Sequence, residues 1–171
     1  MEKFEPRRGA EKLRDSLNLS FGRGVIQFSP IEEWGQRVSE LQVLLVEDDY
    51  DAATLMLRAL EKVDSSCVVQ ILTDGVQAIE YLASGTIPSV VVTDLKMPRK
   101  NGFDVIAWIR SRPALADLPV FVLSCSKEQA DIDQALKLGA TAYFEKPLSL
   151  TELLEIARTI LSRSTPELKK K

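Results

Sequence analysis

The feature that most restricts the possible folds is a regular alternation of short apolar runs with helical patterns, which begins near residue 41 and occurs five times. The apolar runs are VLLV (43–46), CVVQIL (67–72), VVVT (90–93), VFVL (120–123) and TAYF (141–144). Each run precedes a segment whose apolar residues recur at intervals of three and four, which is the period of an amphipathic helix. These segments cover residues 52–63, 75–84, 103–111, 127–139 and 150–163. The alternation predicts five β-strands, each followed by an α-helix.

Strands that are apolar throughout indicate a parallel sheet with helices on both of its faces. Residues that favour helix ends support the boundaries: Gly139 and Pro113 each end a predicted helix, while Ser126 and Gln129 form a capping-box pattern at the start of another. Connections between parallel strands are right-handed. The pattern therefore fits a flavodoxin-like, doubly wound five-stranded sheet with strand order 2-1-3-4-5, or a fragment of a larger doubly wound fold.

The composition excludes several classes of protein. The 171 residues suffice for one domain with some additional chain, and a net charge of −3 gives no strong field to attract nucleic acid or an anionic membrane. There is no histidine, which excludes a Ser-His-Asp triad and a zinc site with histidine ligands. Cys67 and Cys125 cannot form a disulfide framework. Without a secretory signal pattern or an apolar run near the roughly 20 residues that span a bilayer, the chain is expected to be cytoplasmic.

Acidic residues follow two of the predicted strands. Glu47, Asp48 and Asp49 come directly after the first strand, and Asp94 comes directly after the third. In strand order 2-1-3-4-5 these strands are neighbours, so their carboxylates are expected to converge beyond the carboxyl ends of the sheet. Because neighbouring carboxylates repel one another, a bound hard cation with oxygen ligands would relieve the repulsion, and Mg²⁺ is the natural candidate. Asp49 is the residue expected to cap the following helix instead.

The last two strands end in residues that suit phosphoryl chemistry. Ser124 follows the fourth strand, and Lys146 follows the fifth. Acids, a cation, a hydroxyl and a lysine at one edge of a sheet are the groups that handle a phosphoryl group. With the phosphoryl charge neutralised, Asp94 could attack as a carboxylate nucleophile and form an acyl phosphate. Taken singly, Asp94 could equally cap a strand, and Ser124 could be an ordinary loop serine.

At these positions the sequence resembles the receiver domain of two-component response regulators, typified by the chemotaxis regulator. The resemblance covers about residues 41–163. Asp94, in TDLKMPRKNG, matches the phosphoacceptor of the family. Asp48 and Glu47 match its acidic pair, with Asp48 the direct metal ligand and Glu47 its partner, and the backbone carbonyl of Lys96 matches the third protein ligand to Mg²⁺.

The remaining matches concern the conformational switch of the family. Ser124, in VLSCS, matches the switch hydroxyl, and Tyr143 matches the switch aromatic residue. Lys146 and Pro147 match the family lysine and the proline after it, whose peptide bond is usually cis. These motifs follow one another in order at consecutive strand ends, which makes their combination more specific than any one of them.

The resemblance implies a phosphorylation switch. A sensor histidine kinase or a histidine phosphotransfer protein would phosphorylate Asp94, and a surface of helix 4, strand 5 and helix 5 would then bind a downstream protein or a second copy of the chain. The motifs LKMPRKNGFDVIAWIR and VLSCSKEQADI look most like stand-alone receivers that include partners of bacterial phytochromes. Such a domain catalyses only its own phosphorylation and dephosphorylation, so it is not expected to be an enzyme. Neither nucleic acid nor a membrane is an expected partner.

Three other functions are possible. A flavodoxin would need a hydroxyl-rich phosphate loop after the first strand, where this chain has the acidic EDDYDA. A haloacid-dehalogenase-like phosphatase would need a second aspartate two residues after Asp94, where this chain has Lys96. A receiver-like module that binds partners independently of phosphorylation would have lost site residues, and none is missing.

The two ends of the chain fall outside the resemblance. Residues 1–40 are expected to be an extension that is partly helical or mobile, with a short helix in SPIEEWGQRVSEL that begins at Ser29. Residues 164–171 are expected to be a basic tail. The expected receiver domain therefore covers residues 41–163.

Overall fold

The computed structural model describes residues 41–164, which form a five-stranded parallel sheet with strand order β2-β1-β3-β4-β5. The strands are β1 (Gln42–Val46), β2 (Val68–Leu72), β3 (Val90–Thr93), β4 (Val120–Ser124) and β5 (Ala142–Glu145). The helices are α1 (Tyr50–Val63), α2 (Gly75–Ala83), α3 (Gly102–Arg110), α4 (Gln129–Lys137) and α5 (Leu150–Ser164), with a short 3-10 turn η2 (Pro113–Leu115) before β4. The predicted flavodoxin-like fold and its strand order are confirmed. The short helix expected near Ser29 lies outside the described residues.

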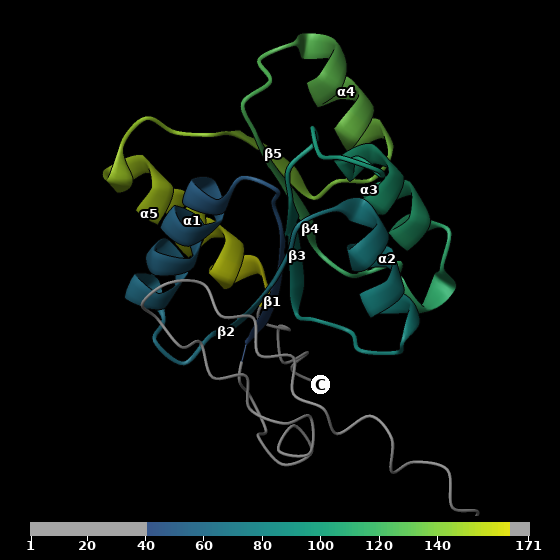
Figure 1. Cartoon of the computed structure of the whole chain (residues 1–171), viewed down its shortest axis with the longest axis horizontal. Helices are drawn as coiled ribbons and strands as arrows, with labels where there is room; N and C mark the ends of the chain where they lie inside the picture. Colours follow the sequence, from purple (N-terminus) through teal and green to yellow (C-terminus); the bar gives the residue numbers. More distant parts are fainter. Residues whose placement is uncertain (1–40, 165–171) are drawn as a thin grey trace, which may run out of the picture. The chain divides into compact units, whose positions relative to one another are not determined.

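The helices form two layers around the sheet. Figure 1 shows the sheet nearly edge-on, with α1 and α5 on one face and α2, α3 and α4 on the other. Alternate residues of each central strand contribute to the two layers, since Val43 and Leu45 pack toward α1 and α5, whereas Leu44 and Val46 pack toward α2 and α3. This alternation follows from the two-residue period of a strand, and it places an apolar core on each face.

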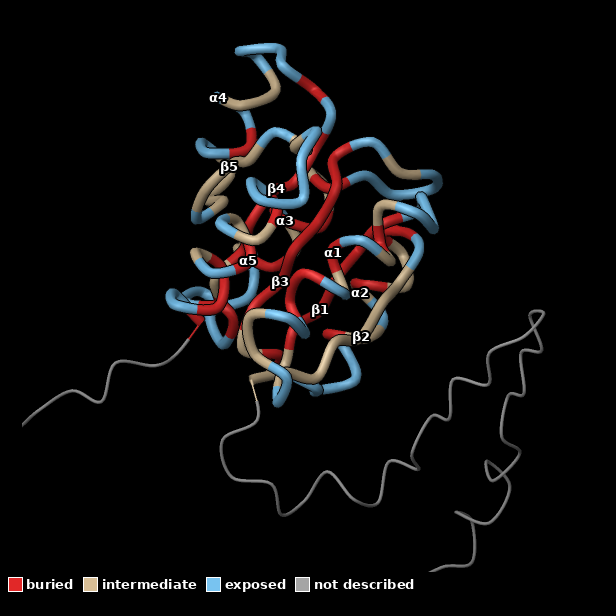
Figure 2. The backbone as a smooth tube through the Cα atoms, turned by 90° about the vertical axis from the view of Figure 1, so that its left-hand side faces the viewer, coloured by how far each residue is buried: buried red, intermediate tan, exposed pale blue. Residues whose placement is uncertain are grey.

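Burial on both faces explains why the central strands are apolar throughout. Every residue of β3 and β4 is buried, and so are four of the five residues of β1. Figure 2 shows these strands as the buried centre of the molecule, with exposed residues concentrated in the helices and loops around them. The outer strands β2 and β5 are mostly half-buried. None of the helices in residues 41–164 is long and apolar enough to cross a membrane.

The helix starts confirm one predicted cap and correct another. Asp49 is the N-cap of α1, and its side chain accepts a hydrogen bond from the Ala52 amide at 2.7 Å. The capping box predicted for Ser126 and Gln129 is wrong: α4 begins one residue after its N-cap Glu128, which makes no side-chain cap bond. The Ser126 hydroxyl lies too far before the helix to cap it and instead donates to the Asp131 carboxylate.

The loop from β3 to α3 folds back closely on the end of β3. The Gly102 amide donates a hydrogen bond to the Leu95 carbonyl at 3.1 Å. A Cβ atom at Gly102 would lie only 2.2 Å from the Asp94 carbonyl oxygen, which is far inside van der Waals contact. Only glycine therefore allows the chain to close this loop immediately behind Asp94.

The close approach of Gly102 to the Asp94 carbonyl predicts that Gly102→Ala strongly lowers the stability of the fold. We expect this substitution to lower the free energy of unfolding by about 3 kcal/mol, because the backbone at Asp94 would have to move. Gly85→Ala is a suitable control: Gly85 has φ +94° but open space around it, so its expected cost is that of the left-handed conformation, about 1 kcal/mol. Chemical denaturation of both variants measures the difference. Equal losses would contradict this explanation of Gly102.

Candidate functional site

The sheet register places the ends of β1 and β3 side by side. Val46 pairs with Thr93, and the Asp94 amide donates to the Val46 carbonyl at 3.0 Å. Glu47 directly follows Val46 and Asp94 directly follows Thr93, so the two acids come immediately after paired residues of β1 and β3. The predicted convergence of their carboxylates is the direct result of parallel pairing in register.

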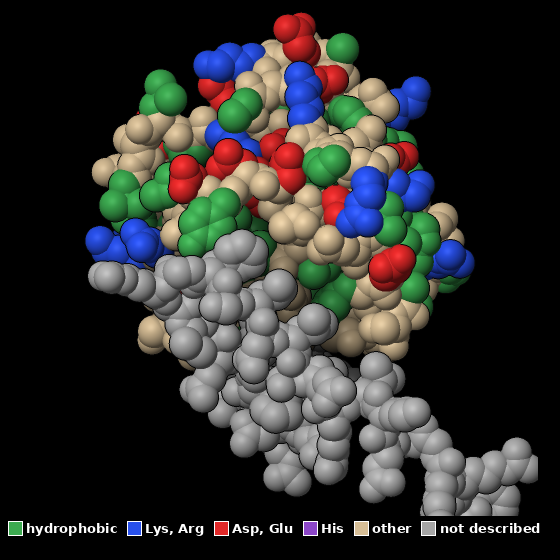
Figure 3. Space-filling model, viewed as in Figure 1, with side chains coloured by type: hydrophobic (Ala, Val, Ile, Leu, Met, Phe, Trp, Pro, Cys, Tyr) green, Lys and Arg blue, Asp and Glu red, His purple; other side chains and the backbone are tan. Residues whose placement is uncertain are grey.

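Three carboxylates gather at this edge. One oxygen atom from each of Glu47, Asp48 and Asp94 lies within 4.8 Å of the others. Glu47 is 4% exposed and Asp94 is 7% exposed, whereas Asp48 is open to solvent. Figure 3 shows acidic side chains across the upper middle of the face, at the same end of the molecule as the carboxyl ends of the strands in Figure 1. This set of oxygen donors, two buried and one accessible, fits a hard divalent cation such as Mg²⁺.

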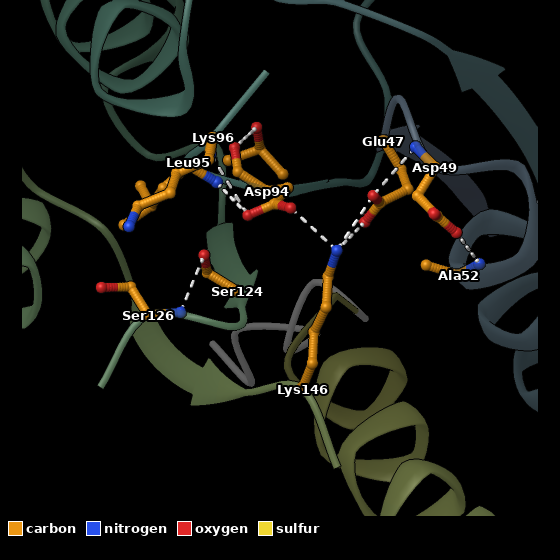
Figure 4. Close-up of polar contacts among 10 residues, drawn as sticks. Glu47, Asp49, Ala52, Asp94, Leu95, Lys96, Ser124, Ser126 and Lys146 are labelled. Atoms are coloured by element: carbon orange, nitrogen blue, oxygen red, sulfur yellow. Dashed lines mark hydrogen bonds and ion pairs between the residues drawn. The ribbon is translucent and has the colours of Figure 1, made fainter. Parts of the chain in front are cut away.

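The Lys146 ammonium group bridges two of the carboxylates. Its Nζ atom lies 2.8 Å from Oδ2 of Asp94, and it lies 2.7 Å and 2.9 Å from the two oxygens of Glu47. Figure 4 shows the lysine reaching up between the two acids from the end of β5. Register again sets its position, since Glu145 pairs with Ser124 and the Lys146 amide donates to the Ser124 carbonyl at 2.8 Å.

The pKa of Glu47 and the pKa of Lys146 are both raised, but for different reasons. Burial raises the pKa of Glu47, and the hydrogen bond and charge of Lys146 oppose this only in part. Burial lowers the pKa of Lys146, but the hydrogen bonds and charges of Asp94 and Glu47 outweigh it, so the pKa is raised overall. Burial therefore dominates at Glu47, whereas the two neighbouring carboxylates dominate at Lys146. A single ammonium group serves two buried carboxylates, so the cluster retains excess negative charge. Such a cluster favours additional positive charge.

Backbone amides fix the other oxygen of Asp94. Its Oδ1 atom accepts hydrogen bonds from the amides of Leu95 at 2.5 Å and Lys96 at 3.3 Å. Lys96 thus lies in the loop directly beside the acids, with its side chain exposed. The Asp94 carboxylate is therefore held by the loop on one oxygen and by Lys146 on the other (Figure 4).

Ser124 and Tyr143 lie on the neighbouring strands. The Ser124 side chain is buried at the end of β4, beside Asp94 (Figure 4), and its Oγ atom is 3.5 Å from the Ser126 amide. The Tyr143 hydroxyl donates to the Ser126 carbonyl at 2.8 Å, and burial raises the pKa of Tyr143. Tyr143 is therefore linked through Ser126 to Ser124, which ends the strand next to the one that Asp94 follows.

Two sets of contacts made by buried polar residues were not predicted from the sequence, and one expected feature is absent. Asp74 precedes α2 and pairs with Arg99, and Ser126 connects Tyr143 with Asp131. An aspartate directly before a helical pattern could have identified Asp74 as a cap, but nothing local predicts its arginine partner. The described residues contain no cis peptide bond, so the cis bond expected before Pro147 is not present.

Comparison with known proteins identifies the fold independently. The family model described as "Response regulator receiver domain" matches residues 43–158. FilR2 of Methanothrix harundinacea, a probable methanogenesis regulatory protein, is 33% identical over 116 residues, which are 65% of this chain and 75% of that protein. The response regulator MprA of Mycobacterium avium is 35% identical over 127 residues, or 74% of this chain. The chain spans only 54% of the length of MprA.

Solved structures give the same result. The phosphorylated cyanobacterial phytochrome response regulator RcpA superposes with a TM-score of 0.68 and is 31% identical, with 74% of this chain and 98% of RcpA covered. The Mn²⁺-bound form of the response regulator Rcp1 gives a TM-score of 0.66 at 27% identity, with 76% of this chain and 98% of Rcp1 covered.

The bridging lysine predicts a pH-dependent effect of Lys146→Met on stability. Near neutral pH this variant leaves the Glu47 and Asp94 carboxylates adjacent, buried and without their cation. We expect the free energy of unfolding to fall by about 2–3 kcal/mol, less than for a fully buried pair because some solvent reaches the site. As the pH falls, Glu47 takes up a proton early because its pKa is raised, so the difference from wild type should shrink.

Lys127→Met is the matched control for this prediction, because Lys127 pairs with Glu145 at an exposed site. Its removal should change stability little at any pH. Denaturant titrations at several pH values measure both variants. A loss for Lys146→Met that stays constant or grows on acidification would contradict the explanation.

Proposed function

This chain belongs to the family of response regulator receiver domains, and we propose that it accepts a phosphoryl group on Asp94 and thereby switches a protein-binding surface. The observation that carries the proposal is the shared ammonium group of Lys146, which contacts Asp94 and Glu47 together. A buried carboxylate with one oxygen on a lysine and the other on backbone amides is oriented to react and is close to a positive charge that stabilises phosphoryl oxygens.

The acidic cluster would hold the metal ion that phosphoryl transfer requires. Asp48, Glu47 and Asp94 would supply carboxylate oxygens, and Lys96 would supply its backbone carbonyl. A bound Mg²⁺ would contribute positive charge that neutralises oxygens of the phosphoryl group. The grouping of the three acids supports this assignment, and so does the Mn²⁺-bound state of Rcp1.

The transfer itself would proceed on the Asp94 carboxylate. One of its oxygens forms a bond to phosphorus while the bond from phosphorus to a histidine nitrogen of the donor breaks, and the electron pair of that bond stays on the nitrogen. These 171 residues contain no histidine, so we expect the donor histidine to belong to a sensor histidine kinase or a histidine phosphotransfer protein. The likeness to the phytochrome response regulator RcpA supports a phytochrome-type kinase. Lys146 then has new phosphoryl oxygens to bind.

Ser124, Ser126 and Tyr143 would carry the change to the surface. The phosphoryl group offers acceptor oxygens to the Ser124 hydroxyl. Movement of Ser124 would shift the Ser126 amide next to it, and Ser126 holds both the Tyr143 hydroxyl and the Asp131 carboxylate of α4. The ligand acts by favouring one of two arrangements of this network, which is a shift of population.

The surface that responds would consist of α4, β5 and α5. Leu136 of α4 is 46% exposed, and Leu150 at the start of α5 is 52% exposed. An exposed ion pair between Lys127 and Glu145 joins the segment before α4 to β5. This mixture of apolar and charged groups suits a downstream protein or a second copy of the chain. Receiver domains are generally signalling modules, and this one would turn over no separate substrate.

Intact-protein mass spectrometry tests the proposal. We expect wild type incubated with Mg²⁺ and acetyl phosphate to gain the mass of one phosphoryl group, and we expect no gain after Mg²⁺ is removed by a chelator. Asp94→Asn should stay unmodified, because the amide is not a nucleophile of the same kind. Asp117→Asn removes an exposed acid outside the site and should gain the group as wild type does.

A negative result with acetyl phosphate has to be checked with a protein donor. If acetyl phosphate modifies neither protein, a phosphorylated histidine kinase serves as the donor in the same assay. A wild type that remains unmodified with both donors contradicts the proposal and favours a receiver-like module that binds its partners without phosphorylation.

A further inference from the structure

An ion pair between a buried aspartate and a partly exposed arginine connects the loop after β2 with the loop after β3. Asp74 is 3% exposed and is the N-cap of α2, where its Oδ1 atom accepts hydrogen bonds from the amides of Val76 at 2.8 Å and Gln77 at 3.0 Å. Capping uses only this oxygen. The Oδ2 atom binds the guanidinium group of Arg99, which lies in the loop between β3 and α3. The second contact therefore serves something other than the start of α2.

Arg99 has an unfavourable backbone conformation. Its φ is +64°, and it is the only non-glycine residue among the described ones with a positive φ. The left-handed region costs an ordinary residue about 1–2 kcal/mol, and glycine would avoid that cost. The contact of the arginine side chain with Asp74 offsets part of that cost.

The backbones of the same two loops also touch. The Gly75 amide donates to the Lys100 carbonyl at 3.1 Å, and a Cβ atom at Gly75 would lie 2.5 Å from that oxygen. The loop after β3 is thus tied to the start of α2 through two successive residues, Arg99 by its side chain and Lys100 by its carbonyl. At its other end the loop is closed by the Gly102 amide on the Leu95 carbonyl.

Lys96 lies within this tied loop. Its amide is already bound to the Asp94 carboxylate, and its carbonyl is a proposed ligand to the metal. Mg²⁺ requires near-octahedral geometry at about 2.0–2.1 Å, so even a small displacement of a carbonyl weakens coordination. We propose that Asp74 and Arg99 are positioning residues that hold the loop after β3 in the conformation in which the Lys96 carbonyl can bind the metal.

Electrostatics and positioning predict opposite effects of removing the Arg99 side chain on metal affinity, which makes the proposal testable. Removing a positive charge near an acidic site should strengthen cation binding by electrostatics. Loss of positioning should weaken it, and the removal of groups that orient metal ligands typically costs about tenfold or more. We therefore expect Arg99→Ala to bind Mn²⁺ about tenfold more weakly than wild type.

The Mn²⁺ affinity is measured by titrating the full chain with Mn²⁺ and following free Mn²⁺ by electron paramagnetic resonance. The measurement requires no phosphorylation. Lys100→Ala is the matched control, because it removes the same charge from the next residue and keeps the backbone contact with Gly75. It should bind Mn²⁺ as tightly as wild type or slightly more tightly.

The double variant Asp74→Asn with Arg99→Ala separates geometry from charge. Its net charge equals that of wild type, and asparagine remains a good N-cap for α2. Electrostatics alone would return wild-type affinity, whereas positioning predicts that the double variant stays about tenfold weaker. Mn²⁺ affinity equal to wild type in either Arg99→Ala or the double variant would overturn the proposal, and so would a wild type that binds no Mn²⁺.

The inference rests on the proposed function only through the role of the Lys96 carbonyl, and the two can fail separately. If Mn²⁺ affinity responds to Arg99 but Asp94 accepts no phosphoryl group, the positioning role stands and the proposed function fails. If Asp94 is phosphorylated but Mn²⁺ affinity ignores Arg99, the proposed function stands and the positioning role fails.

Discussion

The ammonium group of Lys146, shared between the buried carboxylates of Glu47 and Asp94, is the interaction on which the site depends. Two buried acids at adjacent strand ends would repel one another strongly without a cation. The lysine offsets part of that repulsion and holds both side chains in place, with oxygen distances of 2.7–2.9 Å. It does not neutralise the third acid, Asp48. The site therefore still favours further positive charge.

The sheet makes this arrangement possible because it delivers each group from a different strand at the same edge. Glu47 follows β1, Asp94 follows β3, Ser124 ends β4 and Lys146 follows β5. The apolar cores on both faces fix these strands, and the loops beyond them have to close tightly around the acids. Gly102 behind Asp94 and the contact of Gly75 with Lys100 are the points of closest approach.

Periodicity and strand order were enough to predict the centre of the site from the sequence. Glu47, Asp94 and Lys146 could be placed together because each directly follows an apolar run, and parallel pairing brings such positions to one edge. Asp49 could be identified as a helix cap because capping is local. The capping box at Ser126 was wrong because the start of α4 depends on where the loop from β4 turns, which the pattern does not specify. The pair of Asp74 and Arg99 was missed because the two residues are 25 positions apart, and their contact depends on the path of two loops.

A crystal structure of the chain with Mg²⁺ and beryllofluoride, a mimic of a phosphoryl group, would test the central claim most directly. We expect beryllofluoride on the Asp94 carboxylate, Mg²⁺ among Glu47, Asp48, Asp94 and the Lys96 carbonyl, and the Lys146 ammonium turned toward the fluorine atoms. A structure from those conditions in which Asp94 is unmodified and Lys146 still bridges Glu47 and Asp94 would contradict it.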